Sequence, residues 1–281
     1  MIHEPAIIAM DLDDTLLRQD LTISDRTVRV LGECSRRGIA IMLASGRAPE
    51  AMNPYARRIG LDRMKSYMIC NNGSQTIRSD TGELVIEHRL PTDIALEAFR
   101  LTVEAGLSCH IYQDDLIFVS KETEYSERDR MLSGLKPVIP EDYEELIRKG
   151  VYKLVIPGDP EFIVPVEAEF KVLFRDRATI FVSKPFFLEV LPMGVGKGEA
   201  LKEIAEGILG VGSDRVMAFG DSMNDESMIR YAGLSVAMKN SRPEILRLAR
   251  DVTDETNDDD GIADFLERRV LAGKSCTSGA L

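Results

Sequence analysis

Two carboxylates that could act together in catalysis stand near the start of the chain, in the segment Asp11–Thr15. The apolar run Ala6–Met10 precedes them and predicts a buried strand, so they should emerge at the carboxyl end of that strand, where open α/β sheets bind ligands. One chemistry that fits is phosphoryl transfer, in which Asp11 attacks phosphorus while Asp13 protonates the leaving group and then activates water. The competing interpretation is a polar turn, because Asp and Thr are common in turns.

A second acidic group follows another predicted strand, Val216–Gly220. Asp221 and Asp225 stand four residues apart where a helix should begin, and this spacing puts both carboxylates on one face of its first turn. Together with Asp11 they would supply the oxygen ligands that Mg²⁺ prefers. Capping of the helix by the same polar residues is the alternative.

Residues suited to binding phosphate follow two further strands. Ser45, Gly46 and Arg47 come after an apolar run and before Pro49, so a hydroxyl, an accessible backbone and a guanidinium meet at a helix start. A capping turn with a solvated arginine is the alternative. Asn72 ends the next strand, and its amide either contacts the substrate or satisfies its own loop.

A lysine at the start of a later helix is also unusual. The segment Gly194–Gly198 superficially matches a nucleotide-binding phosphate loop, but Leu191 replaces the first required glycine, and Gly198 stands where Ser or Thr is needed. Lys197 would lie at the positive end of the helix dipole, which disfavours a cation. A nearby anion would resolve this conflict.

The composition is that of a globular protein, and it limits the classes of partner. The 281 residues include 35 Lys and Arg against 47 Asp and Glu, which gives a net charge of -12. Such a charge repels nucleic acids and anionic membrane surfaces, so we expect neither as a partner. No segment has the pattern of a signal peptide or the length of a membrane span, and we expect a cytoplasmic protein.

The scarcity of histidine and the scatter of cysteine leave carboxylates as the expected catalytic groups. The chain has 3 His and 4 Cys, and the cysteines form no CxxC pair. Neither a zinc site nor a disulfide framework is therefore predicted, and we expect the cysteines to be reduced and mostly buried.

Helices and strands alternate in the first part of the chain and predict βαβ units with a parallel sheet. From about Leu84 the pattern becomes α+β, with a hairpin expected about Asp114 and Asp115. Parallel α/β character returns with a helix predicted at 197–208. We therefore predict an α/β core formed by residues 1–83 and 190–271, an insert at 84–189, and a tail without periodicity at 272–281.

Taken together, these motifs resemble the haloacid dehalogenase-like superfamily, in particular the Cof-type hydrolases, which carry a large α+β cap. Asp11–Thr15 resembles the nucleophile loop of that family, Ser45–Arg47 its phosphate-binding loop, Lys197 its cation, and Gly220–Asp225 its metal loop. The resemblance implies a Rossmann-like core and an insert that acts as a mobile cap and selects the substrate.

The resemblance also implies a role for each candidate residue. Asp11 would be the nucleophile and Asp13 the general acid and base, and both would bind Mg²⁺ together with Asp221. The supporting roles would be as follows: Asp225 behind the metal ligands, Ser45, Gly46 and Lys197 around the phosphoryl group, Asn224 steadying the metal loop or Lys197, and Arg47 and Asn72 facing the substrate.

The expected function is that of a magnesium-dependent phosphatase that acts on a small phosphorylated metabolite, for example a sugar phosphate, through an aspartyl-phosphate intermediate. Two alternatives stay open. One is a phosphomutase-like transferase that returns the phosphoryl group to its substrate. The other is a non-catalytic module that binds phosphate or metal on the same fold.

Overall fold

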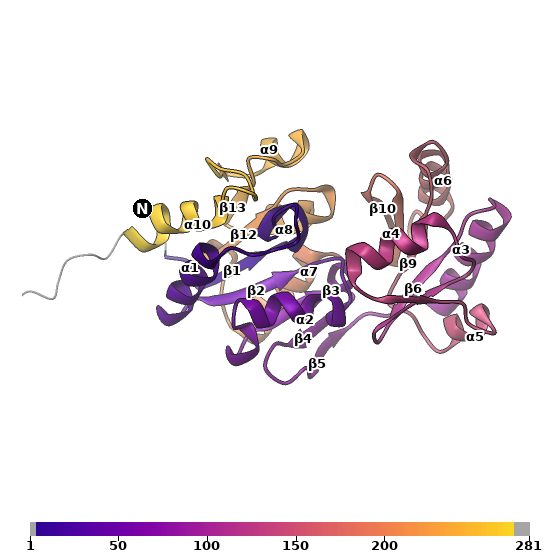
Figure 1. Ribbon diagram of the computed structural model, residues 1–281, viewed down its shortest axis with the longest axis horizontal. Coiled ribbons are helices and arrows are strands. Elements are labelled where there is room, and N and C mark those ends of the chain that lie inside the picture. The colour runs from indigo at the N-terminus through magenta and orange to yellow at the C-terminus, as the bar shows by residue number, and fades with distance from the viewer. Residues whose placement is uncertain (1–3, 273–281) are drawn as a thin grey trace, which may run out of the picture.

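The computed structural model describes residues 4–272 and contains two β-sheets in separate lobes (Figure 1). We call the eight-stranded sheet, with the helices packed on it, the core lobe. From one edge to the other its strands are β14 (Asp251–Val252), β13 (Leu234–Ala237), β12 (Val216–Gly220), β1 (Ile7–Met10), β2 (Ala40–Ala44), β3 (Tyr67–Cys70), β4 (Gln75–Arg78) and β5 (Leu84–Glu87).

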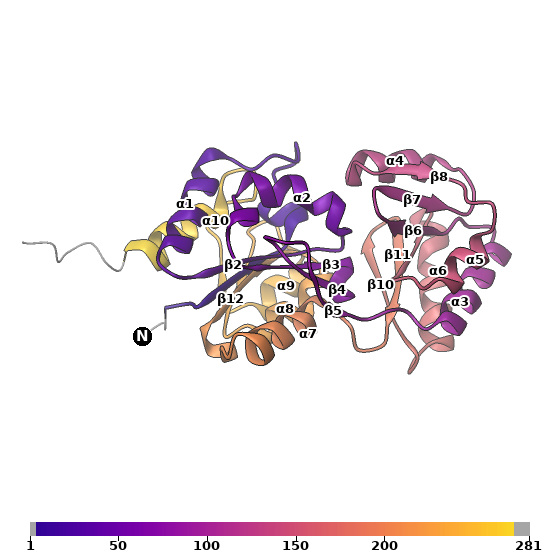
Figure 2. The ribbon, with the colours of Figure 1, turned by 90° about the horizontal axis from the view of Figure 1, so that it is seen from below.

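The strands from β14 to β3 run parallel, whereas β4 and β5 pair antiparallel at one edge. Helices cover both faces of this sheet, and Figure 2 shows the sheet between them. The helices on one face are α1 (Asp25–Arg36), α2 (Pro49–Arg58) and α10 (Gly261–Leu266), and those on the other are α7 (Lys197–Lys202), α8 (Glu226–Tyr231) and α9 (Pro243–Leu248).

Burial on both faces explains why the central strands are almost entirely apolar. Every residue of β1 and of β12 is buried. One hydrophobic cluster joins the sheet to α1 and α10, and another joins it to α7 and α8. A parallel sheet covered in this way leaves only its strand ends to carry polar side chains.

The second lobe is built on a six-stranded sheet, and we call it the inserted lobe because β1–β5 precede it and α7 follows it. Its helix α4 (Glu124–Ser133) lies beside α2 of the core lobe (Figure 2). The strands, in spatial order, are β10 (Ala178–Lys184), β11 (Phe187–Pro192), β9 (Leu154–Pro157), β6 (His110–Gln113), β7 (Leu116–Val119) and β8 (Lys136–Val138), and the other helices are α3 (Thr92–Glu104), α5 (Tyr143–Arg148) and α6 (Pro160–Leu173).

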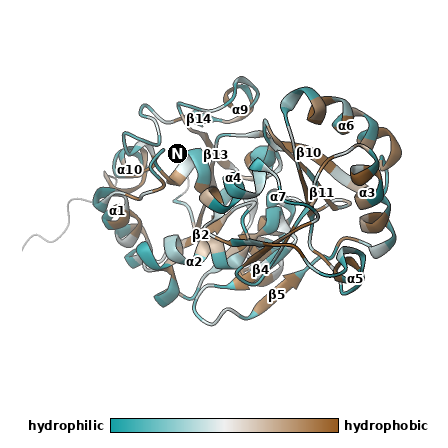
Figure 3. Cartoon of the chain, turned by 45° about the vertical axis from the view of Figure 1, so that its right-hand side comes forward, coloured by the Kyte–Doolittle hydropathy of each residue, from teal (hydrophilic) through white to brown (hydrophobic). Residues whose placement is uncertain are grey.

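The inserted lobe has a hydrophobic core of its own, formed by α3, α5 and α6 against the sheet. Figure 3 shows apolar residues along the strands and polar residues on outward helix surfaces. The predicted hairpin about Asp114 is confirmed, because β6 and β7 pair antiparallel and Asp114 adopts a left-handed φ of 54° in the turn.

The strand β5 belongs to the core sheet, although the sequence pattern placed residues 84–87 in the insert. It pairs antiparallel with β4, and Ile86 packs in the hydrophobic cluster under α7. Antiparallel pairing in this sheet begins with β4 and continues with β5, so the change of pattern at Leu84 lies within the core sheet. Because β11 extends to Pro192 in the other sheet, we propose residues 88–192 as the insert, in place of 84–189.

Three other expectations concern membrane spans, the cysteines and the end of the chain. Within residues 4–272, no helix has both the length and the apolar character that a membrane span requires. Cys34, Cys70 and Cys109 are free and buried, as expected, whereas Cys276 lies outside the described residues. Beyond Ala272, the predicted tail also lies outside them.

Candidate active site

The polar segments singled out in the sequence meet at one edge of the core sheet. Because β1, β2, β3 and β12 are parallel neighbours or next neighbours, their carboxyl ends lie side by side. The residues directly after these ends include Asp11, Ser45, Asn71 and Asp221, all of them buried. The loops that carry these residues therefore converge at one edge of the sheet.

Three buried carboxylates form the centre of this edge. Asp11, Asp221 and Asp225 each place an oxygen within 4.8 Å of the others. Thr15, in the helical turn after β1, donates a hydrogen bond of 2.8 Å to Asp221 Oδ1 and fixes the orientation of that carboxylate. The sequence pattern alone predicts only a turn-shaping role for Thr15.

Lys197 is fully buried among these carboxylates, as the first residue of α7. Its Nζ lies 2.5 Å from Asp11 Oδ1 and 2.7 Å from Asp225 Oδ1. Burial alone would lower the pKa of Lys197, but Asp11 and Asp225 outweigh it and raise the pKa above its usual value. The negative charge expected near Lys197, because this residue begins α7, is thus supplied by Asp11 and Asp225.

Asp225 uses its second oxygen to hold the metal-loop backbone. Its Oδ2 accepts hydrogen bonds from the amide nitrogens of Asp221 and Ser222, at 3.0 and 3.1 Å. With Oδ1 bound to Lys197, both carboxylate oxygens have protein partners. Asp225 therefore joins Lys197 to the backbone of the metal loop.

The cluster is electrostatically suited to a divalent cation. When all four groups are ionised, three carboxylates and one ammonium group leave two negative charges in a buried site. Burial, with contributions from Asp225 and Asp13, outweighs the opposing effect of Lys197 and raises the pKa of Asp11 to about 7. Burial, together with Asp225 and Asp11, raises the pKa of Asp221 well above its usual value. A hard cation such as Mg²⁺ would relieve this repulsion through oxygen ligands, so the residues fit the metal.

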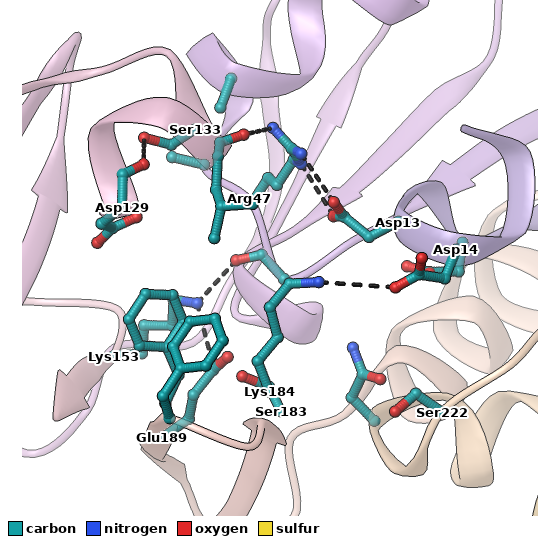
Figure 4. Close-up of a pocket in the computed structure, with 18 of the residues that line it drawn as sticks. Asp13, Asp14, Arg47, Asp129, Ser133, Lys153, Ser183, Lys184, Glu189 and Ser222 are labelled. Atoms are coloured by element: carbon teal, nitrogen blue, oxygen red, sulfur yellow. Dashed lines mark hydrogen bonds and ion pairs between the residues drawn. The ribbon is translucent and has the colours of Figure 1, made fainter. Parts of the chain in front are cut away.

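Asp13 is held by Arg47 in a two-point ion pair, which Figure 4 shows. The Arg47 Nε and a terminal guanidinium nitrogen lie 2.9 and 2.8 Å from the two oxygens of Asp13. Burial would raise the pKa of Asp13, but Arg47 outweighs it and lowers the pKa. The other terminal nitrogen of Arg47 donates to the backbone carbonyl of Leu132 in α4, at 2.6 Å. Arg47 therefore links a catalytic candidate to the inserted lobe.

The loop after β2 approaches the loop after β3 closely, and this approach explains its glycine. A methyl group at Gly46 would lie 3.0 Å from Asn72 Nδ2. Ser45 is buried in the same loop, and its hydroxyl accepts a hydrogen bond from the Arg47 amide. A side chain at position 46 would push these two loops apart.

Of the two adjacent asparagines after β3, Asn72 contacts the other candidate residues. Its Nδ2 donates to Glu189 at 2.8 Å, and its Oδ1 accepts from Asn224 at 3.3 Å. Asn71 instead donates to Gln75. The side-chain amide of Asn224 thus steadies Asn72. The resemblance had implied that Asn224 steadies either the metal loop or Lys197.

Two charged residues of the inserted lobe join the site and were not singled out in the sequence. Lys153, just before β9, donates to the carbonyl of Gly46 at 2.7 Å and to Glu189 of β11 at 2.8 Å. Each is a single charge in an otherwise apolar strand region, and both are about 4 % exposed. A buried charge within an apolar strand was the signal that could have identified them.

A cavity of about 350 Å³ lies between the two lobes and opens onto these groups. The core lobe lines this cavity with residues that include Asp11, Asp13, Gly46, Arg47, Asp221 and Asn224. Four further candidate residues stand behind this wall and contact residues that line the cavity: Ser45, Asn72, Lys197 and Asp225. The inserted lobe forms the opposite wall with residues that include Asp129, Lys153 and Glu189.

Comparison with known proteins agrees with this geometry. A family model described as haloacid dehalogenase-like hydrolase matches residues 8–266. An HMP-PP phosphatase from Escherichia coli O157:H7 is 31% identical over 239 residues, which cover 85% of this chain and 86% of that protein.

Two solved structures from Bacteroides thetaiotaomicron are also similar. A haloacid dehalogenase-like hydrolase has a TM-score of 0.86 and 30% identity, and the match covers 94% of this chain and 99% of that one. A phosphatase of the same superfamily has a TM-score of 0.79 and 26% identity, with 94% and 95% covered. The present chain therefore belongs to the haloacid dehalogenase-like hydrolases, as an enzyme of their phosphatase class.

Proposed function

We propose that this enzyme is a magnesium-dependent phosphatase that hydrolyses a small phosphorylated metabolite, such as a sugar phosphate, through an aspartyl-phosphate on Asp11. The observation that supports it most is the position of Lys197. Its ammonium group binds one oxygen of Asp11 within the acidic cluster, and the Asp11 carboxylate also lines the cavity. A nucleophile held in this way presents its second oxygen to a bound phosphate.

In the first step, Asp11 Oδ2 forms a bond to phosphorus while the bond from phosphorus to the leaving oxygen breaks. Asp13 gives its proton to that oxygen. In the second step, water attacks phosphorus and gives a proton to Asp13, which frees phosphate and restores the Asp11 carboxylate. The acid and the base are thus the same residue, and the cycle is balanced.

Asp13 can donate a proton only after Arg47 releases it, because the two-point ion pair favours the ionised carboxylate. We propose that the substrate phosphate, a competing two-point acceptor, draws Arg47 away from Asp13. Binding of substrate would then free Asp13 to take up the proton that the first step needs.

The metal would be held by Asp11, Asp221 and the backbone carbonyl of Asp13, with Asp225 behind them. When bound, the cation supplies positive charge that offsets the negative charge of the reacting phosphoryl group. Ser45, the Gly46 backbone and Lys197 would bind the phosphoryl oxygens, and Asn224 and Asn72 would keep the two loops at a fixed separation.

The test is phosphate release from a panel of phosphorylated metabolites, with Mg²⁺ and with a chelator, for the wild type and for Asp11→Asn. We expect release that needs the metal and that falls by about 10³-fold or more in the variant. Asp20→Asn, an exposed change in the following loop, is the matched control and should keep wild-type rates. Turnover without metal, or substantial turnover by Asp11→Asn, would contradict the proposal. Isomerised substrate without free phosphate would indicate a phosphomutase.

A further inference from the structure

Asp129 is a buried carboxylate in the inserted lobe that the proposed chemistry does not use. It lies on α4, its side chain is 4 % exposed, and it lines the cavity between the lobes. Figure 4 shows Asp129 and Asp13 entering the drawn pocket from opposite sides. Asp129 is therefore placed to meet the part of a substrate that lies away from phosphorus.

One oxygen of Asp129 is fixed by two neighbours. The Tyr112 hydroxyl lies 2.7 Å from Oδ2, and His110 Nδ1 lies 2.8 Å from the same atom. Because a carboxylate only accepts, both partners carry the hydrogen in these contacts. His110 is fully buried, so this pair holds the carboxylate from behind with a fixed orientation.

The other oxygen of Asp129 accepts no hydrogen bond from any residue within 4–272. This oxygen is not among the fully buried side-chain atoms that lack a partner, so it faces the cavity that Asp129 lines. A donor on a bound ligand would find an acceptor there that no protein group occupies. The free oxygen thus indicates a ligand with a hydroxyl or amino group at this end of the cavity.

The nearby cations do not change this requirement, because three of the four that line the cavity are paired with other acids. Among the lining residues, Arg47 pairs with Asp13, Lys153 with Glu189 at 2.8 Å, and Lys184 with Asp14 at 3.7 Å. The remaining lining cation, Arg242, is exposed and belongs to the core lobe. A second anionic group on the substrate would therefore meet Asp129 without a free cation beside it.

We propose that Asp129 determines specificity: its free oxygen accepts a hydrogen bond from a hydroxyl or amino group of the leaving group, and its charge disfavours leaving groups that carry a second phosphate or carboxylate there. This inference rests on the proposed phosphatase function and narrows its substrate class to polyhydroxylated or amino compounds, such as sugar and amino-sugar monophosphates. His110 and Tyr112 act as positioning residues.

The variant Asp129→Asn separates this role from a structural one. Its amide oxygen keeps the hydrogen bonds from Tyr112 and His110, while its NH₂ group faces the cavity and replaces an acceptor with a donor. The matched control is Glu127→Gln, which removes one exposed charge from the same helix, where Glu127 pairs only with Arg130 among the described residues.

The experiment compares kcat/KM for four kinds of probe: hexose and amino-hexose monophosphates, their single-deoxy analogues, a hexose bisphosphate, and p-nitrophenyl phosphate. In the wild type, removal of one particular hydroxyl or amino group should lower kcat/KM by about 10- to 100-fold, mainly through KM. In Asp129→Asn the same removal should cost less than about 3-fold, and the bisphosphate should gain relative to the monophosphate. Glu127→Gln should behave as the wild type does.

Each other outcome has a defined meaning. An equal fall for all probes in Asp129→Asn, or a deoxy effect of the same size in both proteins, would overturn the specificity role. Wild-type turnover of p-nitrophenyl phosphate with no preference for hydroxyl or amino groups would overturn the inference and leave the phosphatase proposal standing. A wild type that releases phosphate from no probe would overturn both. Thermal unfolding of each variant checks that it is folded.

Discussion

At the scale of single residues, the orientation of the metal-site carboxylates depends on side chains that do not themselves react. Asp221 accepts from the Thr15 hydroxyl, and Asp225 accepts from two backbone amides and Lys197. Such partners restrict the rotation of a carboxylate before the metal arrives, and they reduce the entropy lost on binding. Thr15 is the clearest case, because its hydroxyl makes a single side-chain contact with the cluster.

We predict that Thr15→Val weakens Mg²⁺ binding by about 10-fold, because valine keeps the shape of threonine but cannot orient Asp221. The measurement is the Mg²⁺ concentration that gives half-maximal phosphate release, supported by calorimetric titration of the metal. Thr15→Ser retains the hydroxyl and should stay close to the wild type. Equal metal affinity in the valine and serine variants would show that the hydrogen bond does not hold Asp221.

At the scale of elements, the position of Lys197 depends on how closely α7 packs against α8. A methyl group at Gly198 would overlap the backbone carbonyl of Ser227 in α8. Lys197 precedes this contact directly, so the approach of the two helices sets the depth at which its ammonium group enters the acidic cluster. Glycine is required here for space, since its φ is in the ordinary range.

We predict that Gly198→Ala lowers the free energy of unfolding by about 1–3 kcal/mol, because α7 must move away from α8. Gly207, in the helical turn that continues α7, is the matched control, because a methyl group added there would have no atom within 4 Å. Gly207→Ala should raise stability by about 0.5–1 kcal/mol, because it reduces the entropy of the unfolded chain. Chemical denaturation measures both effects, and equal destabilisation by the two variants would argue against the packing explanation.

The contrast between β1 and β11 explains how far the sequence could predict the site. The carboxylates after β1 follow an uninterrupted apolar strand, and a parallel topology brings such strand ends together, so Asp11, Ser45 and Asp221 were accessible to prediction. Glu189 lies within β11, and its meeting with Asn72 depends on how one lobe docks on the other. The docking of one lobe on the other leaves no periodic pattern in the sequence. For this reason neither the contact of Glu189 with Asn72 nor the position of Asp129 in the cavity could be predicted.

At the scale of the whole molecule, each lobe has its own hydrophobic core, and a small cluster joins them. Ala48, directly before α2, and Ala51 within α2 pack against Ile117, Val119 and Leu135 of the inserted lobe. The two larger clusters of the core lobe contain no residue of 88–192, and the large cluster of the inserted lobe contains only residues of that range. Each lobe therefore has the interior that an independently folded unit needs.

We predict that replacing residues 88–192 by a short Gly/Ser linker leaves a core lobe that unfolds cooperatively, as monitored by circular dichroism. Removal of 84–189 instead deletes β5 and uncovers the cluster that contains Ile86, so this matched variant should be less stable by about 1–3 kcal/mol. Both variants should lose selectivity among phosphorylated substrates. A non-cooperative transition in the first variant would mean that the two lobes fold as one unit.

The parallel pairing of β1 with β12 also has a consequence for synthesis on the ribosome. Ile7 lies opposite Val216, so the first strand of the chain waits for a neighbour that is translated long afterwards. The six strands of the inserted lobe are contiguous in sequence and can pair with one another earlier. The inserted lobe is thus expected to fold before β1 and β12 pair, and the acidic edge of the core sheet acquires Lys197 only after the inserted lobe has been translated.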